Sequence, residues 1–337
     1  AFLNGKMDLA QAEAVMELIS AQGREAMKAA QAGHDGALSR RIAAIRDDLT
    51  DVGAHLAAWA DYPDDDIPQV DENMLKERLS AGHDVLEALI RSFDGGRVLR
   101  EGVVTVIAGK PNAGKSTLMN LLAGCERSIV TDLAGTTRDV VEETVLLGEI
   151  PLRLADTAGI RETEDRVEQI GVKIALDRVR TAQFVLAVFD ASEALNDDDR
   201  AMMEAIGETP CVAVVNKSDL PAAIDMAEIE ARFPAVVTIS ALSGDGLSAL
   251  AEAAARVLQT AELNPNDGIL YTERQRADAK DALACIEEAQ DALLRGMTWD
   301  AVTVSLEGAV AALNELTGER VSDAVVDRVF EKFCVGK

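Results

Sequence analysis

The sequence predicts an α/β domain, with a mostly parallel sheet and helices on both faces, inserted into a discontinuous all-α domain. Three observations support this fold class: helical periodicity at both ends of the 337-residue chain, short β-branched apolar runs between helical stretches in its middle, and a polar linker, "TAELNPNDG", after them. Neither helical end offers much core alone. We therefore expect one helical domain built from residues 1–97 and 261–337, with the inserted domain over 98–260.

The first helical half is expected to hold three helices. The stretch "DLAQAEAVMELI" opens with Asp8, and Gln11 follows three residues later, which is a capping-box arrangement. Gly33 and Gly36 predict a break before a second helix that reaches Ala60. The prolines and the acidic run of "DYPDDDIPQVDE" prevent that helix from continuing, and a third helix is expected over 72–92, ending at "DGG".

Five apolar runs in the middle of the chain predict buried strands. The runs are rich in β-branched residues and alternate with helical stretches, as expected for a parallel sheet covered on both faces. The runs are "GVVTVIAG", "LRLAD", "FVLAVFD", "CVAVVNK" and "PAVVTIS". Beyond the linker, helices are expected through Arg295, from Trp299 to Leu316 and from Arg320 to Phe333.

The bulk composition limits the class of protein. Hydrophobic residues make up 48% of the chain, which is typical of a globular protein. The net charge of −26 disfavours broad non-specific binding to nucleic acid or to an anionic membrane, although it leaves room for a local basic patch. No apolar run approaches the length of a membrane span, and four dispersed cysteines indicate reduced thiols in a cytoplasmic protein.

A phosphate-binding loop is indicated at residues 109–117. The stretch "GKPNAGKST" fits the pattern G-x-x-x-x-G-K-[ST] and stands between a predicted strand and a predicted helix. Its glycines allow backbone N–H groups to turn toward phosphate oxygens, while Lys115 can reach the β and γ phosphates and Ser116 can ligate Mg²⁺. An ordinary glycine-rich turn is the alternative interpretation, and the placement between strand and helix favours nucleotide binding.

Three further motifs follow in the order expected for a guanine-nucleotide switch. "DTAG" opens with Asp156, a carboxylate suited to the Mg²⁺ water shell. In "NKSD", the Asp219 carboxylate can accept from the guanine N1–H and exocyclic amine together, and in "SAL" the Ala241 amide can donate to guanine O6. These motifs predict a Ras-like G domain that binds GTP and GDP. The candidate contacts are Asn112, Ala113, Gly114, Lys115, Ser116, Thr117, Asp156, Thr157, Ala158, Gly159, Asn216, Lys217, Asp219, Ser240, Ala241 and Leu242.

Several stretches resemble the MnmE (TrmE) family of tRNA-modification GTPases. "GKPNAGKSTLMNLLAG", "IVTDLAGTTRD", "DTAGIRETEDRVEQIG" and the terminal "FCVGK" carry the resemblance, and the opening "AFLNGKMDLAQAEAV" is similar to the start of that family's helical domain. The resemblance covers essentially the whole chain. Members also carry an N-terminal domain that binds a formyl-tetrahydrofolate and forms a constitutive dimer. Because the sequence begins at Ala1 with residues similar to the start of the helical domain, we expect that N-terminal domain to be absent from it.

The resemblance suggests what replaces a missing catalytic glutamine. In many GTP-hydrolysing switches a glutamine follows this motif and orients the attacking water, whereas here Ile160 forms no side-chain hydrogen bond. Family members are stimulated by K⁺ and pair their G domains across the nucleotide face. The resemblance implies that Glu168 orients water through a bridging water, although spacing alone does not separate it from Glu162, Glu164 or Asp165. K⁺ would supply the charge that an arginine finger provides elsewhere.

The resemblance also implies ligands for the two metals and residues for the modification chemistry. Thr137 completes the Mg²⁺ coordination begun by Ser116. K⁺ is expected to be bound by Asn112, Thr131, Leu133 and Thr136, within a loop that contains Thr131, Asp132, Leu133, Ala134, Gly135, Thr136 and Thr137. Cys334 matches the cysteine of the family's terminal motif, and Lys6 and Lys337 match positions that help to bind folate. From the sequence alone, both lysines are ordinary solvated charges.

The function implied by the resemblance is K⁺-stimulated GTP hydrolysis in the C5 modification of the tRNA wobble uridine (U34), by aminomethyl or carboxymethylaminomethyl addition. The family acts on tRNA as a homodimer paired through its G domains, with the FAD-dependent partner MnmG and a tetrahydrofolate derivative, and no membrane is involved. Two alternatives remain open: a regulatory GTPase switch of ribosome assembly without a modification role, and a nucleotide-binding scaffold with negligible hydrolysis. The "FCVGK" tail speaks against the ribosome-assembly alternative.

Overall fold

The computed structural model describes residues 2, 5–21, 23–61, 68, 71–124, 143–154, 179 and 182–319. The chain divides into a helical unit, residues 1–21, 25–96 and 264–337, and an α/β unit, residues 22–24 and 97–263. None of the helices in the described ranges combines the length and the apolar character that crossing a bilayer demands.

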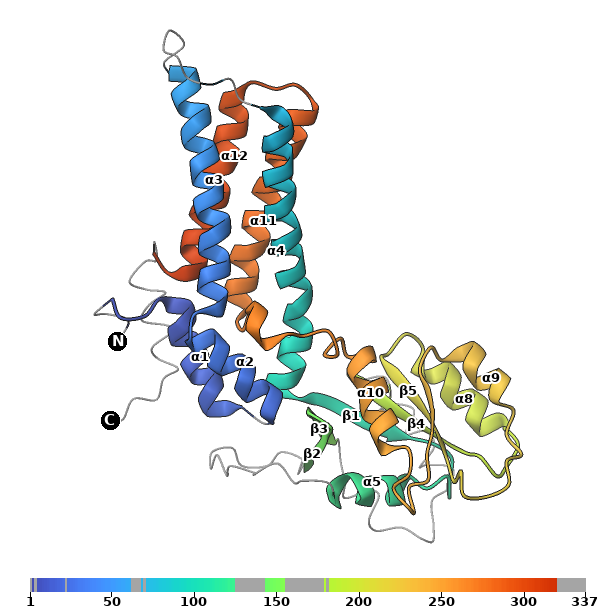
Figure 1. Cartoon of the computed structure of the whole chain (residues 1–337). Helices are drawn as coiled ribbons and strands as arrows, with labels where there is room; N and C mark the ends of the chain where they lie inside the picture. The colour runs from blue at the N-terminus through green and yellow to red at the C-terminus, as the bar shows by residue number, and fades with distance from the viewer. Residues whose placement is uncertain are drawn as a thin grey trace. The chain divides into compact units, whose positions relative to one another are not determined.

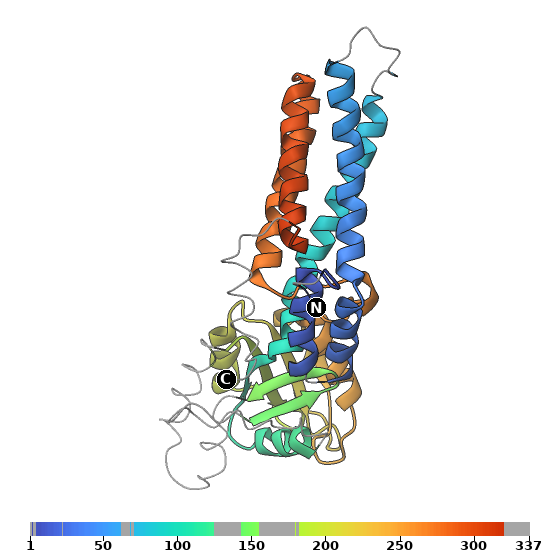
Figure 2. The same cartoon turned by 90° about the vertical axis from the view of Figure 1, so that its left-hand side faces the viewer.

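The described part of the helical unit contains helices from both ends of the chain. They are α1 (Leu9–Ser20), α2 (Arg24–His34), α3 (Ala37–Asp61), α4 (Glu72–Glu101), α11 (Glu273–Leu294) and α12 (Trp299–Thr317), with a 3₁₀ turn (Pro265–Asp267) ahead of α11. In both views α3, α4, α11 and α12 run side by side as a long bundle, with α1 and α2 at its foot (Figure 1 and Figure 2).

One apolar core fills this bundle, and both ends of the sequence contribute to it. Its fully buried members include Ile42, Leu49, Leu79, Leu86, Phe93, Ile286, Leu306 and Leu313. Each such side chain contributes roughly 1.5–3 kcal/mol when it leaves water. α3 and α4 come from the first half of the chain and α11 and α12 from the second, and all four helices contribute to this core.

The start of the helical unit confirms the predicted capping box. The Gln11 amide N–H donates to the Asp8 carboxylate at 2.8 Å, and the Asp8 amide N–H donates to the Gln11 side chain at 3.0 Å. The break predicted at Gly33 and Gly36 is confirmed between α2 and α3, but the first helix already ends at Ser20. Gly23 then adopts a φ of 118°, which a glycine tolerates, and α2 follows as a separate helix.

The predicted end of the third helix at "DGG" is wrong. α4 continues through these residues to Glu101. A Cβ atom at Gly96 would lie 2.7 Å from Cγ2 of Ile269, so this glycine allows close packing and does not end the helix. The helix predicted from Trp299 is confirmed as α12, whereas the one predicted over 320–333 lies outside the described residues.

The described residues of the α/β unit form a six-stranded sheet in the order β2-β3-β1-β4-β5-β6. All neighbouring strands are parallel except β2 and β3, which are antiparallel. The strands are β1 (Val103–Ala108), β2 (Glu143–Leu147), β3 (Ile150–Leu154), β4 (Phe184–Asp190), β5 (Cys211–Asn216) and β6 (Val236–Thr238). The five predicted strands are therefore present, and β2 is an additional one.

Helices pack on this sheet and complete the predicted α/β fold class. They are α5 (Lys115–Gly124), α8 (Asp197–Ile206), α9 (Met226–Arg232) and α10 (Leu247–Val257). α8 and α9 share a buried apolar cluster with Val185, Ala187 and Phe189 of β4. Since successive strand residues point to opposite faces, the intervening residues of β4 face the other way. α5 packs on β1 and β2, and α10 packs on β5 and β6.

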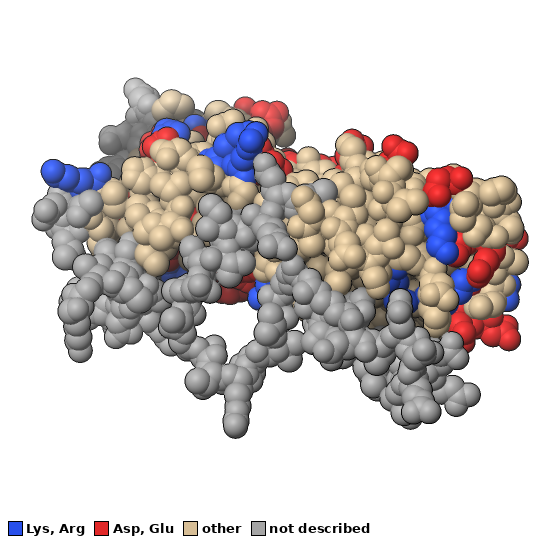
Figure 3. All heavy atoms as spheres, turned by 90° about the horizontal axis from the view of Figure 1, so that it is seen from below, with Lys and Arg blue, Asp and Glu red and all other residues tan. Residues whose placement is uncertain are grey.

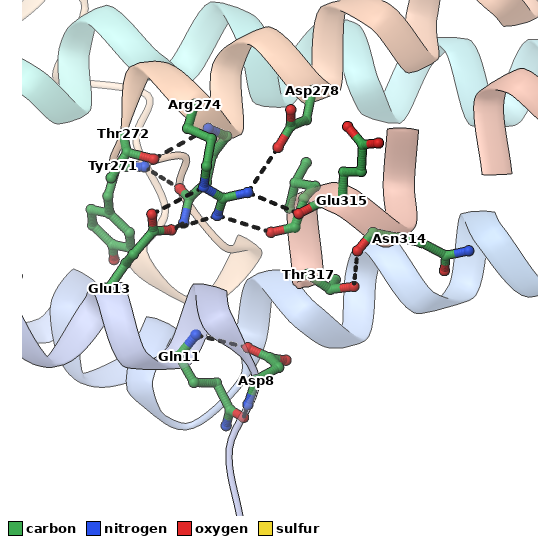
Figure 4. Close-up of polar contacts among 12 residues, drawn as sticks. Asp8, Gln11, Glu13, Tyr271, Thr272, Arg274, Asp278, Asn314, Glu315 and Thr317 are labelled. Atoms are coloured by element: carbon green, nitrogen blue, oxygen red, sulfur yellow. Dashed lines mark hydrogen bonds and ion pairs between the residues drawn. The ribbon is translucent and has the colours of Figure 1, made fainter. Parts of the chain in front are cut away.

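A buried polar network joins α1, α11 and α12 at the foot of the bundle (Figure 4). The Glu13 carboxylate of α1 accepts hydrogen bonds from Arg274 at 2.8 Å and from the Gln275 side chain at 2.6 Å. Arg274 also donates to the Asp278 carboxylate and to the main-chain oxygen of Glu315, both at 2.8 Å. The network therefore links the N-terminal helix to the end of α12.

Candidate nucleotide site

The phosphate loop lies between the end of β1 and the start of α5. At two of its glycines, neighbouring atoms leave no room for a Cβ atom. A Cβ atom at Gly109 would lie 2.5 Å from the Val188 carbonyl oxygen of β4. At Gly114, whose φ is 94°, it would lie 2.1 Å from the Asn216 side-chain nitrogen. The loop is thus pressed against β4 on one side and against the end of β5 on the other.

Lys115 folds back over this loop. Its ammonium group donates to the carbonyl oxygens of Gly109 at 2.8 Å and Lys110 at 2.7 Å, and burial lowers its pKa. Ser116 and Thr117 follow in the first turn of α5 and lie toward the surface. Asn112 is exposed too, and its φ of 61° places it in the left-handed region, which asparagine tolerates better than most residues.

Asn216 connects the phosphate loop to the "SAL" loop. It stands at the end of β5 and is only 2% exposed. Its amide nitrogen donates to the Ala113 carbonyl oxygen at 2.9 Å, and its amide oxygen accepts from the Ala241 N–H at 2.9 Å. Three motifs that are distant in the sequence are therefore joined by one side chain. The Ala241 N–H, which we expected to face guanine, donates to Asn216 in this structure.

The other described residues of the "NKSD" and "SAL" motifs lie around Asn216. The Asp219 carboxylate is exposed and accepts from the Ser240 hydroxyl at 2.7 Å, which fixes its orientation. Leu242 is 82% exposed. Lys217 adopts a φ of 64°, and its ammonium group lies 2.5 Å from the buried carboxylate of Asp190.

Sequence reasoning assigned no role to Asp190, the last residue of β4. It is 2% exposed, and burial would raise its pKa. Hydrogen bonds from Lys217 and Ser192 outweigh that effect, so the pKa is lowered and the carboxylate stays charged. An aspartate that ends a wholly apolar strand run, "FVLAVFD", is the sequence signal that could have marked it.

A second unassigned residue, Lys110, lies inside the phosphate loop. Its ammonium group is 3.0 Å from the Glu193 carboxylate and 3.3 Å from the Asp199 carboxylate, and the side chain is 6% exposed. These ion pairs outweigh burial, the largest single effect, and raise its pKa. A lysine followed by proline in a phosphate loop gives no local hint of this partnership.

Many predicted site residues lie outside the described part of the chain. They are Thr131, Asp132, Leu133, Ala134, Gly135, Thr136, Thr137, Asp156, Thr157, Ala158, Gly159, Glu168, Cys334 and Lys337. Lys6 is described and is exposed near the start of the helical unit. His83 lies with Asp84 and Glu87 on a largely exposed helix face, with ligand atoms close enough to share an ion.

Comparison with known proteins decides the family. A model of the MnmE helical domain matches residues 9–334. The tRNA modification GTPase MnmE of Natranaerobius thermophilus is 40% identical over 340 residues, which cover 100% of this chain and 74% of that protein. The protein of the same name from Acaryochloris marina is 41% identical over 338 residues, with the same coverage. The chain belongs to the MnmE family.

Solved structures resemble part of this MnmE family member. The G domain of the T. maritima FeoB iron transporter is 24% identical, with a TM-score of 0.34, and the match covers 46% of this chain and 98% of that one. A single-residue variant of Aquifex aeolicus Era bound to GDP·AlF₄⁻ is 30% identical, also with a TM-score of 0.34, over 54% of this chain and 66% of that one.

Proposed function

We propose that this MnmE-family GTPase hydrolyses GTP with Mg²⁺ and K⁺ in the pathway that adds aminomethyl or carboxymethylaminomethyl groups to C5 of the tRNA wobble uridine. The observation that carries the proposal is the Asn216 connection. It holds the phosphate loop and the "SAL" loop together, in a chain whose relatives are named tRNA modification GTPases.

The described residues suit both ends of a guanine nucleotide. Lys115 presents an ammonium group at the loop interior, where β and γ phosphates would replace the carbonyl oxygens it now contacts. The oriented carboxylate of Asp219 can accept from the two guanine donors. The Ala241 N–H can reach guanine O6 only by sharing its hydrogen with Asn216, so we propose a three-centre bond there.

The metals are proposed from donor chemistry and family resemblance. The Ser116 hydroxyl is an oxygen ligand of the kind that Mg²⁺ prefers, and it lies at the first turn of α5. Asn112 is an exposed residue of the same loop, and its side-chain oxygen is a ligand that suits K⁺. When bound, K⁺ supplies positive charge beside the β and γ phosphates. With Thr137, Thr131, Leu133 and Thr136 as further ligands and Glu168 orienting water, this arrangement would compensate for Ile160.

The proposed partners are tRNA, MnmG and a second copy of this chain, paired through the G domains. On the face drawn in Figure 3, basic and acidic side chains are interspersed, without a continuous basic stripe among the described residues. Together with the net charge of −26, this favours presentation of tRNA through MnmG over a broad direct contact. We place the folate-derived one-carbon donor near Cys334, Lys6 and Lys337 by resemblance.

We also propose that residues 1–97 and 261–337 form one helical domain into which residues 98–260 are inserted. The apolar core that α3 and α4 share with α11 and α12 supports this division. Cys334, at the far end of the second half, would then belong to the same domain as Lys6.

Complementation tests the proposed function. A strain that lacks the gene would receive the full-length wild type, Lys115→Ala, or the control Lys76→Ala, which alters an exposed ion pair on α4. We expect wild type and control to restore wobble-uridine modification, measured by mass spectrometry of tRNA nucleosides, and Lys115→Ala to fail. Altered ribosome profiles with intact modification in the deletion strain would instead support the ribosome-assembly alternative.

A further inference from the structure

We propose that the segment from Asp190 to Asp199, which carries no recognised nucleotide motif, positions both ends of the nucleotide site. It holds the base-binding loop through Lys217 and the phosphate loop through Lys110. The inference rests on the proposed nucleotide site and adds two positioning residues to it, Asp190 and Lys110. The segment includes the end of β4 and the first residues of α8.

At the base end, Asp190 controls where Lys217 lies. One carboxylate oxygen accepts from the Ser192 amide at 2.9 Å and hydroxyl at 2.6 Å, which fixes the carboxylate. The other oxygen accepts from Lys217 at 2.5 Å. Lys217 has a left-handed backbone conformation and a side chain 31% exposed, so this bond is what keeps its stem from swinging into solvent. Two residues further on, Asp219 carries the proposed guanine contact.

The backbone adds a second connection at the same end. Asp190 of β4 is directly opposite Asn216 of β5 in the sheet register. The next residue, Ala191, donates its N–H to the Asn216 carbonyl oxygen at 2.8 Å. The start of the segment and the start of the base-binding loop therefore move as one piece.

At the phosphate end, Lys110 is held by the other part of the segment. Asp199 is 1% exposed and is fixed by a capping box with Asn196, with bonds of 3.0 and 3.1 Å. Asp199 and Glu193 together hold the Lys110 ammonium group. The carbonyl oxygen of the same Lys110 accepts from Lys115 at 2.7 Å. The ion pairs therefore determine where the backbone that contacts Lys115 lies.

Substitutions at these two connections are predicted to change nucleotide release and base preference in different ways. Asp190→Asn leaves the phosphate loop held and loosens the base side. It should speed the release of a methylanthraniloyl-labelled GDP by about tenfold, the effect of weakening one charged hydrogen bond. It should also reduce the preference for GDP over inosine diphosphate, which lacks the exocyclic amine that Asp219 recognises. Lys110→Met should speed the release of both nucleotides by a similar factor and leave that preference unchanged.

The experiment is stopped-flow release of both nucleotides from the full-length enzyme with Mg²⁺. Arg200→Gln is the matched control, because Arg200 lies on α8 in an exposed pair with Glu228, and it should behave like the wild type. If Asp190→Asn fails to fold, Ser192→Ala takes its place in the test. For this variant we expect about threefold faster release and a reduced preference for GDP over inosine diphosphate.

Two results would overturn the inference. One is a rate of nucleotide release from Asp190→Asn that equals the wild-type rate within error. If Asp190→Asn fails to fold, the same result for Ser192→Ala overturns the inference. The other is an equal change of base preference in the Asp190 and Lys110 variants, because that would mean general loosening of the unit. If the wild type itself binds neither nucleotide, the proposed function fails, and that outcome is distinct from both.

Discussion

Asn216 shows how far a motif predicts a site at the scale of single residues. The pattern "NKSD" located it, but its partners Ala113 and Ala241 are 103 and 25 residues away. Asp190 and Lys110 were not predicted for the same reason, since their partners lie 27 and up to 89 residues away. Motifs mark the groups that face a nucleotide, whereas the residues that hold those groups are determined by tertiary contacts.

Asp278, in the buried network of Figure 4, gives a pH prediction at this scale. Burial is the main cause that raises its pKa to about 6, and nearby carboxylates add to it against the opposing effect of Arg274. Because the folded-state pKa exceeds the ordinary value of 3.8, protonated Asp278 stabilises the fold fully below about pH 4. That stabilisation is lost as the pH rises through about 6.

We therefore expect Asp278→Asn to remove this pH dependence. Between pH 5 and pH 7.5 the wild type should lose about 1 kcal/mol of unfolding free energy that the variant keeps. Urea unfolding followed by tryptophan fluorescence measures it, because both tryptophans, Trp59 and Trp299, lie in the helical unit. Parallel stability curves for the two proteins over this pH range would contradict the assignment.

At the scale of elements, β2 was missed although its turn left a signal. β2 and β3 pair with Leu147 opposite Ile150, so only two residues, Gly148 and Glu149, form the loop. Gly148 has a φ of 62°, as tight hairpin turns require. The run "ETVLLGEIPLRL" contains this glycine between apolar stretches. The expectation of parallel βαβ units led us to assign only its second half.

Two helical glycines give a stability prediction for the bundle. Ala at Gly96 of α4 would bring a Cβ atom 2.7 Å from Ile269, so Gly96→Ala should destabilise the helical unit by about 1–3 kcal/mol. Gly53 of α3 has no atom within 4 Å of that position. Gly53→Ala should therefore stabilise by about 0.5–1 kcal/mol. Urea midpoints measure both, and equal effects of the two substitutions would refute the packing role of Gly96.

At the scale of the whole molecule, the sequence led us to expect that helices from the two ends of the chain share one apolar core. Each end offers amphipathic helices with too little core of its own. One apolar cluster draws its members from both ends, and this supports the proposed pairing. The order of the six strands was not predictable in this way, because every run was similarly apolar and only the register of the pairings distinguishes them.

The central claim is that a monovalent cation supplies the charge and order that a glutamine at Ile160 would otherwise provide. Multiple-turnover GTP hydrolysis by the full-length enzyme, in KCl and in NaCl at several protein concentrations, tests it most directly. We predict a rate in KCl at least about tenfold above that in NaCl, rising with protein concentration, and loss of this advantage in Asn112→Ala. Equal rates in both salts at every concentration would contradict the account.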